Sequence, residues 1–415
     1  MKLKKDLKGC KMPLTKLKMP KTKINKKFLI AGLLASNCLL ANEYFDEKIL
    51  QDNRVEIFNL QKEQAIEDSS KLKKDWINPI IFKYKKEYGS DDEFETTSIS
   101  VDQPIFKSGG IYQAIKYANS SFDYANLDID QQKKELIKTA LNLLFNIHKI
   151  NLNIQKSELL VKNAQIDVQR KKEQVLNGFL DSSYLDNALL TLNDTKISLA
   201  DLKYQKKQLE NSFDNLSSKK YTELELPKFK LFSQEEYLKD NFEILKAQSL
   251  IEKNYNFKNM TIAKYLPTFS AYYTHANIHS KENGLSALGA NTTNYGLYVS
   301  MPLDIRTFND IQSNKIEYLK SKLSLKNKIS DETATYKSAF EKVSMIEEKI
   351  SIINEDLKVY DSILEVMMQE KEAQIKTQSD YDTLKNSSEI KKLDVKTYEL
   401  DKQIELLELY TKLAK

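Results

Sequence analysis

The sequence predicts a mainly α fold with a small β part, in which two similar halves each join two short strands to a very long helical hairpin. Three observations predict it. The 415 residues include only 9 Gly and 7 Pro, so turns are few and elements are long. Neither Gly nor Pro occurs at residues 111–177 or 303–415. An alternating segment that ends at a proline, Pro104 or Pro302, precedes each run, and internal repetition of this kind indicates a repeated architecture.

Residues 1–41 are predicted to be a basic leader and signal peptide. The first 27 residues hold eleven Lys and a single acidic residue, and an apolar run follows at residues 28–36. Small residues near Ala41 suit cleavage. The apolar run is too short to predict a membrane span. An uncleaved N-terminal anchor and a start at Met19 stay open as alternatives.

Both cysteines, Cys10 and Cys38, lie in this leader, so the mature chain is expected to have no disulfide and no thiol chemistry. Attachment of a lipid at Cys38 is an alternative that stays open. The net charge of +5 comes from the leader, and the rest of the chain is slightly acidic. The sequence therefore indicates no basic patch for nucleic acid.

The first structural repeat is predicted over residues 42–227. A helix at 43–75 ends before Pro79, because the residue before a proline is pushed out of the helical region. Alternation at 80–88 and 97–101 predicts two strands. Gly109 and Gly110 then precede the long helix.

The second structural repeat is predicted over residues 228–415. Residues 234–264 are expected to be helical as far as Pro267, and residues 269–274 and 295–301 alternate as strands. Pro302 is expected to open the second long helix. A loop that contains Gly284 and Gly289 lies between the two strands.

Each long helix carries an apolar seam at alternating spacings of four and three residues, from Leu136 to Ile154 and from Ala339 to Met367. A sustained heptad of this kind requires a partner helix. Each outbound helix of about 70 residues would span roughly 100 Å at 1.5 Å per residue. Residues 177–179 and 374–376 are predicted to reverse the chain, so that a shorter helix returns along the first.

Four strands per chain are too few to close a barrel, and an open edge is not tolerated in lipid. If these strands cross a membrane, several copies must share one barrel, and three copies would give about twelve strands. One face of the strands is expected to meet the lipid. The candidates for this face are Phe82, Tyr84, Ile99, Val101, Phe269, Tyr273, Tyr295, Leu297 and Val299. The hairpins of the same copies could then close into a tube.

The paired strand boundaries Pro79/Pro267 and Pro104/Pro302, the duplicated element order and the paired reversals carry a family resemblance over residues 43–415. The chain resembles the TolC-like outer-membrane efflux proteins, also called outer membrane factors. The resemblance implies a trimer in the cell outer membrane, with a twelve-stranded β-barrel and a long periplasmic α-barrel. It also implies a periplasmic adaptor and an inner-membrane pump of the RND or ABC type as partners, in drug efflux or type I secretion. One departure is Ala373, which stands where the second reversal usually has a glycine.

The resemblance places an acidic ring at the periplasmic mouth, with Asp382, Asp380 and Asp186 as candidates for a pore gate. Three equal carboxylates around one axis would repel each other and bind cations. The alternative is that an Asp in the first turn only stabilises the helix N-terminus.

The reversals themselves are the expected adaptor contacts, because helix tips at the end of a tube suit a ring of partners. The alternative is that they are only turns, and that Tyr184 packs within the hairpin. The candidates are Gly178, Ser183, Tyr184, Lys376, Ser379 and Tyr381.

No enzyme, cofactor or metal site is predicted. The chain has three His, and His275 and His279 lie in a strand that runs into a loop, where a four-residue spacing does not form a rigid pair. No nucleophile, base and oxyanion site can be assembled from the remaining residues. Two other classes stay open: a periplasmic coiled-coil adaptor, which would have one hairpin and Gly-rich β-domains, and a structural coiled-coil protein.

Overall fold

The computed structural model describes residues 46–88, 92–282, 285–286 and 290–414. The predictions about the leader, Met19, Cys38 and the loop glycines Gly284 and Gly289 lie outside these residues. The elements follow the chain in this order: η1 (Glu47–Ile49), α2 (Asp52–Lys74), β1 (Ile81–Tyr88), β2 (Asp92–Phe106), α3 (Gly110–Leu176), α4 (Ser182–Asp214), η2 (Tyr221–Glu223), α5 (Gln234–Lys239), α6 (Phe242–Lys264), β3 (Thr268–Glu282), β4 (Leu285–Ser286), β5 (Ala290–Ser300), α7 (Thr307–Glu372) and α8 (Gln378–Thr411).

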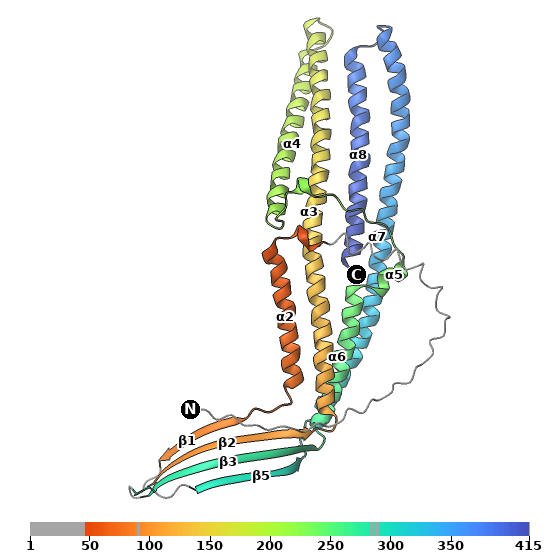
Figure 1. Ribbon diagram of the computed structural model, residues 1–415. Coiled ribbons are helices and arrows are strands. Elements are labelled where there is room, and N and C mark those ends of the chain that lie inside the picture. Colours follow the sequence, from red (N-terminus) through yellow and green to blue (C-terminus); the bar gives the residue numbers. More distant parts are fainter. Residues whose placement is uncertain (1–45, 89–91, 283–284, 287–289, 415) are drawn as a thin grey trace, which may run out of the picture.

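Two long helices form the frame of the molecule (Figure 1). The helix α3 has 67 residues and returns as α4 with 33, and α7 has 66 residues and returns as α8 with 34. In the half near the reversals the neighbours are α4, α3, α8 and α7, in that order. In the half near the sheet they are α2, α3, α6 and α7. The predicted fold of long helical hairpins with four main strands per chain is confirmed.

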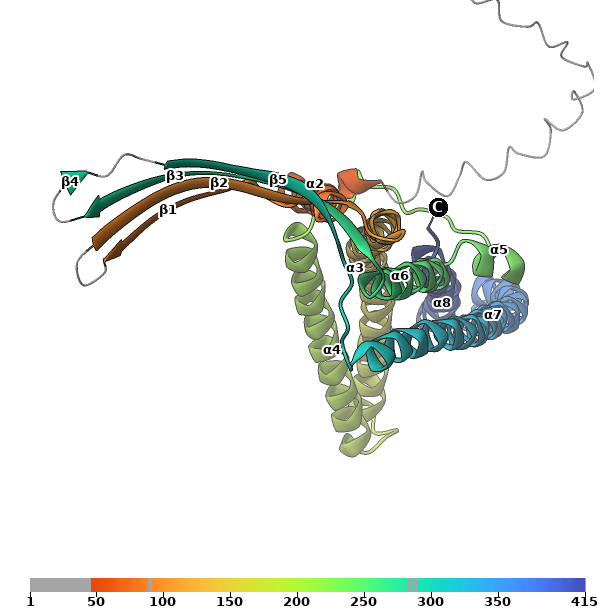
Figure 2. The same cartoon turned by 90° about the horizontal axis from the view of Figure 1, so that it is seen from below.

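The strands form one curved antiparallel sheet that extends sideways from the base of the helices (Figure 1, Figure 2). The four long strands pair in the order β1, β2, β3, β5, and β4 adds a two-residue pairing to β3. Among the described residues β1 and β5 are the edges, each with one unpaired side. The predicted strand at 97–101 is much shorter than β2, which continues through an irregular register between Pro104 and Phe106.

The pairing register puts the nine apolar strand candidates on one face of the sheet. Phe82 pairs with Ile99, and Val101 lies across from Tyr273, which pairs with Tyr295. Since side chains alternate between faces, the other members, two or four residues along, share that face. Eight of these nine side chains are exposed, and Val101 is partly buried.

Three predicted helix boundaries were wrong. The helix expected at 43–75 begins at Asp52, because residues 46–51 form a 3-10 turn and an extended link whose Leu50 is buried. The helix expected at 234–264 is broken by Asn241, whose side chain accepts from the N–H groups of Glu243 at 2.9 Å and Ile244 at 3.3 Å and so starts α6.

The third wrong boundary is Pro302, which does not open α7. A linker follows it, in which the Asp304 carboxylate accepts from the backbone N–H of Arg306 at 2.9 Å and from its side chain. This turn competes with helical hydrogen bonding, and the helix begins only at Thr307.

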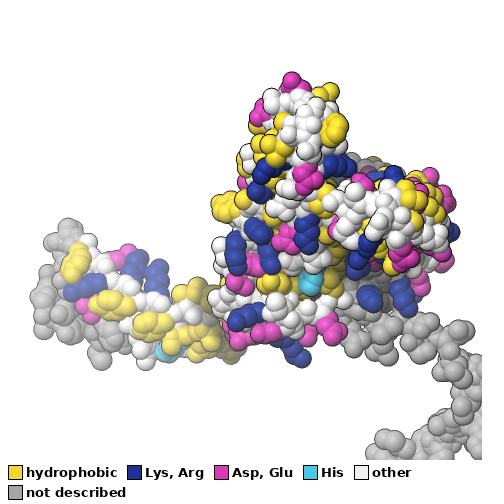
Figure 3. Space-filling model, turned by 90° about the horizontal axis from the view of Figure 1, so that it is seen from above, with side chains coloured by type: hydrophobic (Ala, Val, Ile, Leu, Met, Phe, Trp, Pro, Cys, Tyr) yellow, Lys and Arg dark blue, Asp and Glu magenta, His cyan; other side chains and the backbone are white. Residues whose placement is uncertain are grey.

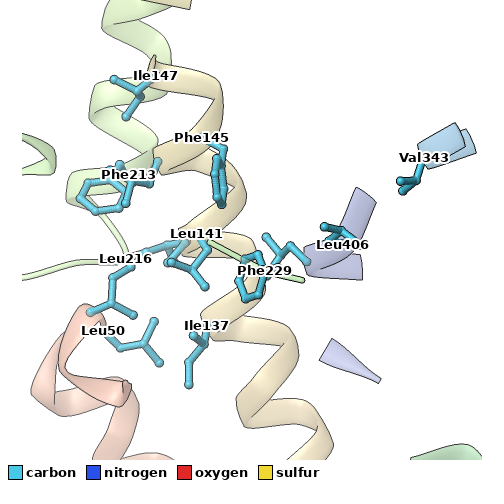
Figure 4. Close-up of a cluster of buried hydrophobic side chains, with 14 residues drawn as sticks. Leu50, Ile137, Leu141, Phe145, Ile147, Phe213, Leu216, Phe229, Val343 and Leu406 are labelled. Carbon is cyan, nitrogen blue, oxygen red and sulfur yellow. The ribbon is translucent and has the colours of Figure 1, made fainter. Parts of the chain in front are cut away.

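The main core lies at mid-height, where α3 meets α4, α8 and the segment before α2 (Figure 4). Leu144, Phe145, Ile147, Phe213 and Leu407 are at most 1 % exposed. The predicted seams follow buried rows: in α7, Val343 and Ile346 are buried and the other seven positions are partly buried. Heptad packing between α7 and α8 therefore holds the second hairpin together.

Residues 215–233, here called the strap, cross from α4 to α5 over α3 and α8. The backbone N–H of Phe229 donates to Gln403 of α8 at 2.6 Å, and the Tyr410 hydroxyl donates to the carbonyl of Lys230 at 2.9 Å. The ring of Phe232 packs 5.0 Å from the ring of Tyr410 and 6.3 Å from that of Tyr336. These contacts tie the first half of the chain to the second at mid-height.

A buried polar node lies next to the strap. Glu332 of α7, 5 % exposed, accepts from the Tyr237 hydroxyl, from Asn241 at 3.0 Å and from Lys412 at 3.0 Å. The backbone of the last residues also pairs here, since Phe242 donates to the carbonyl of Lys412 at 2.9 Å. The node therefore joins α5, α6, α7 and the end of α8.

The helices come very close together where they meet the sheet. A Cβ at Gly110, the first residue of α3, would lie 3.0 Å from the Cβ of Ala263 on α6 and 3.4 Å from that of Lys107. Glycine at this position lets α3 and α6 cross this closely without any displacement of Ala263.

Candidate functional site

The two reversals lie at the same end of the molecule, far from the sheet (Figure 1). In the first, Gly178 has φ 73°, and its N–H donates to the carbonyl of Val175 at 3.0 Å. The N–H of Phe179 donates to the carbonyl of Gln174 at 2.8 Å. This pair of bonds is the Schellman motif, which ends a helix and satisfies its last carbonyls.

The second reversal is the same motif with a different residue at the left-handed position. Gln374 has φ 60°, its N–H donates to Lys371 at 3.0 Å, and the N–H of Ile375 donates to Glu370 at 2.8 Å. The counterpart of Gly178 is therefore Gln374, and the sequence prediction that put Ala373 in that place was wrong by one residue. Ala373 has φ −77° and ends α7 as an ordinary C-cap.

The returning helices begin with side-chain caps. Asp181 accepts from the N–H of Ser183 at 2.8 Å at the start of α4. At the start of α8, Thr377 accepts from the N–H of Asp380 at 3.2 Å and its hydroxyl donates to the Asp380 carboxylate at 2.8 Å. This hydrogen bond from Thr377 is the main cause that lowers the pKa of Asp380. Arg170 of α3 also contacts this carboxylate at 3.4 Å.

The three gate candidates are not equivalent. Asp380 is engaged in the capping box, which agrees with the helix-terminus alternative. Asp382, partly buried, accepts from the side chain of Gln378 at 2.7 Å, and Asp186 is exposed on α4. A ring of equal carboxylates at any one of these positions would require several copies of the chain.

The adaptor candidates lie on both tips. Gly178, Ser183, Lys376 and Ser379 are exposed, as is Tyr184, whose ring lies 5.3 Å from the Lys171 ammonium. Tyr381 is partly buried, and its ring lies 5.2 Å from Lys371. Each tyrosine thus lies beside a lysine of the same hairpin, which agrees with the packing alternative for Tyr184.

Sequence reasoning missed three apolar side chains on these tips. Leu176, Phe179 and Ile375 are 71–79 % exposed. Phe179 and Ile375 are the residues that directly follow the two left-handed positions. Apolar residues after a helix end at such a turn usually pack back on the helix, so nothing in the sequence signalled that these two side chains are exposed. Leu176 and Phe179 lie on the first tip and Ile375 on the second, so each tip exposes at least one large apolar side chain.

The described helices carry both basic and acidic side chains on their surfaces. Seen from the tips, basic and acidic side chains are interspersed over the helices (Figure 3). No described helix has the length and apolar character needed to span a membrane. His275 lies 2.8 Å from the Thr293 hydroxyl, and the side chain of His279 is outside the described part. No group of three or more potential metal ligands was found in the described part.

Several solved structures have a similar architecture. CusC matches with a TM-score of 0.70 at 13% identity, over 90% of this chain and 91% of CusC. The outer membrane protein VceC from Vibrio cholerae matches with a TM-score of 0.69 at 12% identity, over 90% of this chain and 97% of VceC. The Campylobacter jejuni CmeC outer membrane channel matches with a TM-score of 0.69 at 12% identity, over 90% and 87% of the two chains.

No protein-family model and no curated protein sequence matches the chain. The structural likeness extends over nearly the whole of each chain, from the sheet to the reversals. The chain therefore has the fold of the TolC-like outer-membrane channels.

Proposed function

We propose that this chain is one subunit of an outer-membrane channel in a tripartite export system. Three copies would pool their strands in a twelve-stranded barrel and close their helices into a periplasmic tube. Drugs or secreted molecules would enter from an inner-membrane pump of the RND or ABC type through a periplasmic adaptor. The subunit itself would carry out no chemistry.

The main support for the proposal is that the sheet of one chain is open and cannot close into a barrel by itself. Among the described residues the sheet ends at β1 on one side and β5 on the other, and no further strand pairs with either edge. In lipid the backbone groups at these edges must be paired, which only a closed barrel achieves. The apolar face with Phe82, Phe269 and Leu297 would meet lipid. The opposite face carries polar groups such as the Tyr298 hydroxyl, which donates to Asp102 at 2.6 Å, and would meet water.

The tips are the proposed adaptor surface. Leu176, Phe179 and Ile375 would supply apolar anchors beside the predicted contacts on both reversals. An interface of this kind obtains most of its affinity from a few buried apolar groups. Replacing Phe179 by Ser is expected to weaken capture of the adaptor while the trimer remains.

Asp382 is the proposed gate residue, since Asp380 has a structural role as a cap. In a trimer its carboxylate would occur three times near one axis and attract cations. The variant Asp382→Asn in planar lipid bilayers is expected to lose block by divalent cations. Asp186→Asn, on the exposed side of α4, is the matched control and is expected to retain the block.

Outer-membrane fractionation with gel mobility before and after heating tests the channel directly. We expect a detergent-resistant trimer in the outer membrane that separates into single chains on heating, and loss of export when the chain is deleted. A water-soluble monomer would instead support the adaptor or structural alternatives.

A further inference from the structure

The helix α4 has an apolar row that is exposed and is not covered by any other described part of the chain. Leu190, Ile197 and Tyr204 are spaced by seven residues, and they lie opposite Ala188 and Leu192, which are buried against α3. A heptad-spaced row on a helix surface is the pattern that a second helix covers.

The helix α7 has a second apolar row of the same kind. Met345, Ile352, Val359 and Val366 are also spaced by seven, and they differ from the seam that faces α8. The seven side chains of the two rows are 42–65 % exposed. The α7 row lies at the opposite edge of the wall from α4, since the helices follow the order α4, α3, α8, α7.

The two rows match in height along the molecule. Counted from the helix ends at the tips, Leu190, Ile197 and Tyr204 lie 8, 15 and 22 residues from Ser182. Val366, Val359 and Ile352 lie 6, 13 and 20 residues from Glu372. The constant difference of two residues is about 3 Å at 1.5 Å per residue.

We propose that α7 of one copy packs antiparallel on α4 of the next copy, with Leu190 beside Val366, Ile197 beside Val359 and Tyr204 beside Ile352. The proposal rests on the function proposed above and gives that assembly its interface and register. The partner is a second copy of this chain, because a copy turned about a common axis keeps its height and presents the matching row. The surfaces in contact are different on the two sides, so the contact leads to a ring rather than to a two-fold dimer.

The order of the sheet agrees with this arrangement. The strand β1 lies on the same edge of the chain as α2 and α4, and β5 precedes α7 on the other edge. A neighbour placed by the α4–α7 contact would therefore bring its β1 to the unpaired side of β5. Both edges of the chain would be covered by the same neighbour relationship.

Cysteine cross-linking in isolated outer membranes tests the register. The described residues contain no cysteine, so introduced thiols can be read without interference from them. The double variant Ile197→Cys with Val359→Cys is expected to form a ladder that ends at three chains when copper–phenanthroline oxidises paired thiols. The control is the pair Ile197→Cys with Val366→Cys, whose distances from the tip differ by about nine residues, or about 13 Å along the helix axis. This pair is expected to stay uncross-linked, because a disulfide requires Cα atoms within about 7 Å.

The single variants Ile197→Cys and Val359→Cys complete the test. A dimer from either one alone would show a two-fold contact and overturn the proposal, as would efficient cross-linking of the offset pair. If the protein forms heat-sensitive trimers in the outer membrane but the matched pair does not cross-link, the register is wrong and the channel proposal stands. If the protein is monomeric, both are wrong.

Discussion

Gln374 holds a backbone conformation that a side chain makes costly. Its φ of 60° matches the 73° of Gly178 in the other hairpin. A non-glycine residue in the left-handed conformation costs about 1–2 kcal/mol. Glycine avoids this strain, but its greater freedom in the unfolded chain costs about 0.5–1 kcal/mol. The same turn is therefore built once with the favoured residue and once without it.

Replacing Gln374 by Gly is expected to stabilise the second tip by about 0.5 kcal/mol, because the relief of strain exceeds the entropy cost of glycine. Hydrogen exchange of the Ile375 amide, which bonds to Glu370, should slow accordingly. The control is Ala373→Gly, at a right-handed position with φ −77°, which should speed the same exchange. Equal effects of the two variants would contradict the assignment of the left-handed position.

Lys134 of α3 is predicted to make stability depend on pH. Its ammonium donates to the carbonyl of Leu413 at 2.6 Å, and burial lowers its pKa from 10.5 to about 8. Between these pH values the folded chain binds fewer protons than the unfolded chain, so the free energy of unfolding rises with pH from this group. Below pH 8 the full destabilisation from burying the charged Lys134 ammonium is present.

Thermal unfolding followed by circular dichroism at pH 7.5 and pH 10 measures this contribution. Other lysines and tyrosines also titrate in the range, so the useful quantity is the difference between the chain and Lys134→Met. The variant should show a smaller rise in stability with pH. An identical rise in both proteins would mean that the Lys134 pKa is not lowered.

At the scale of elements, the buried Glu332 joins α7 to α5, α6 and the end of α8. Glu332→Gln keeps the shape but weakens the charged hydrogen bonds from Lys412, and we expect it to lower the free energy of unfolding by about 2 kcal/mol. Glu317→Gln, whose carboxylate is an exposed partner of Lys320 at 3.4 Å, should change it by less than about 0.5 kcal/mol. Urea unfolding followed by circular dichroism compares them, and similar losses would refute a role of burial.

The elements that could be predicted from the sequence are those set by long patterns. The seam from Ala339 to Met367 has nine positions at alternating spacings of four and three residues, and it predicted α7 and its partner α8 correctly. Breaks set by one polar side chain could not be predicted: Asn241 interrupts a continuous helical pattern by capping its own backbone. The Asn241 side chain also donates to the buried Glu332, which is 91 residues away in the sequence. The two residues meet only in the tertiary fold, so the sequence pattern did not reveal this contact.

The candidate site divides in the same way. Both reversals lie where the sequence predicted them, at residues 177–179 and 374–376, and Gly178 has the left-handed conformation at which helices commonly end. The assignment of Asp380 was left open between gate and cap, since only its contacts with Thr377 and Arg170 distinguish them. The exposed Phe179 and Ile375 were missed, because apolar residues in a turn suggest packing until their exposure is known.

At the scale of the whole molecule, the two faces of the sheet are expected to meet different surroundings. Leu297 and Asn294 are both exposed on β5, but they lie on opposite faces. Leu297→Arg should reduce stability in lipid by about 2–4 kcal/mol if its face meets the membrane interior. Asn294→Arg should be tolerated in a water-filled lumen. Unfolding from lipid vesicles compares the variants, and equal tolerance would contradict the assigned faces.

If three copies assemble as proposed, the close crossing at Gly110 has a consequence for the bore of the conduit. A side chain there would require the neighbouring atoms to shift by a few tenths of an ångström, since a Cβ would stand 3.0 Å from the Cβ of Ala263. In a closed ring of three subunits such a shift would occur three times around one circumference, so about 0.3 Å per subunit would enlarge the radius by roughly 0.15 Å. The absence of a side chain at Gly110 would therefore make a small contribution to the width of the proposed conduit.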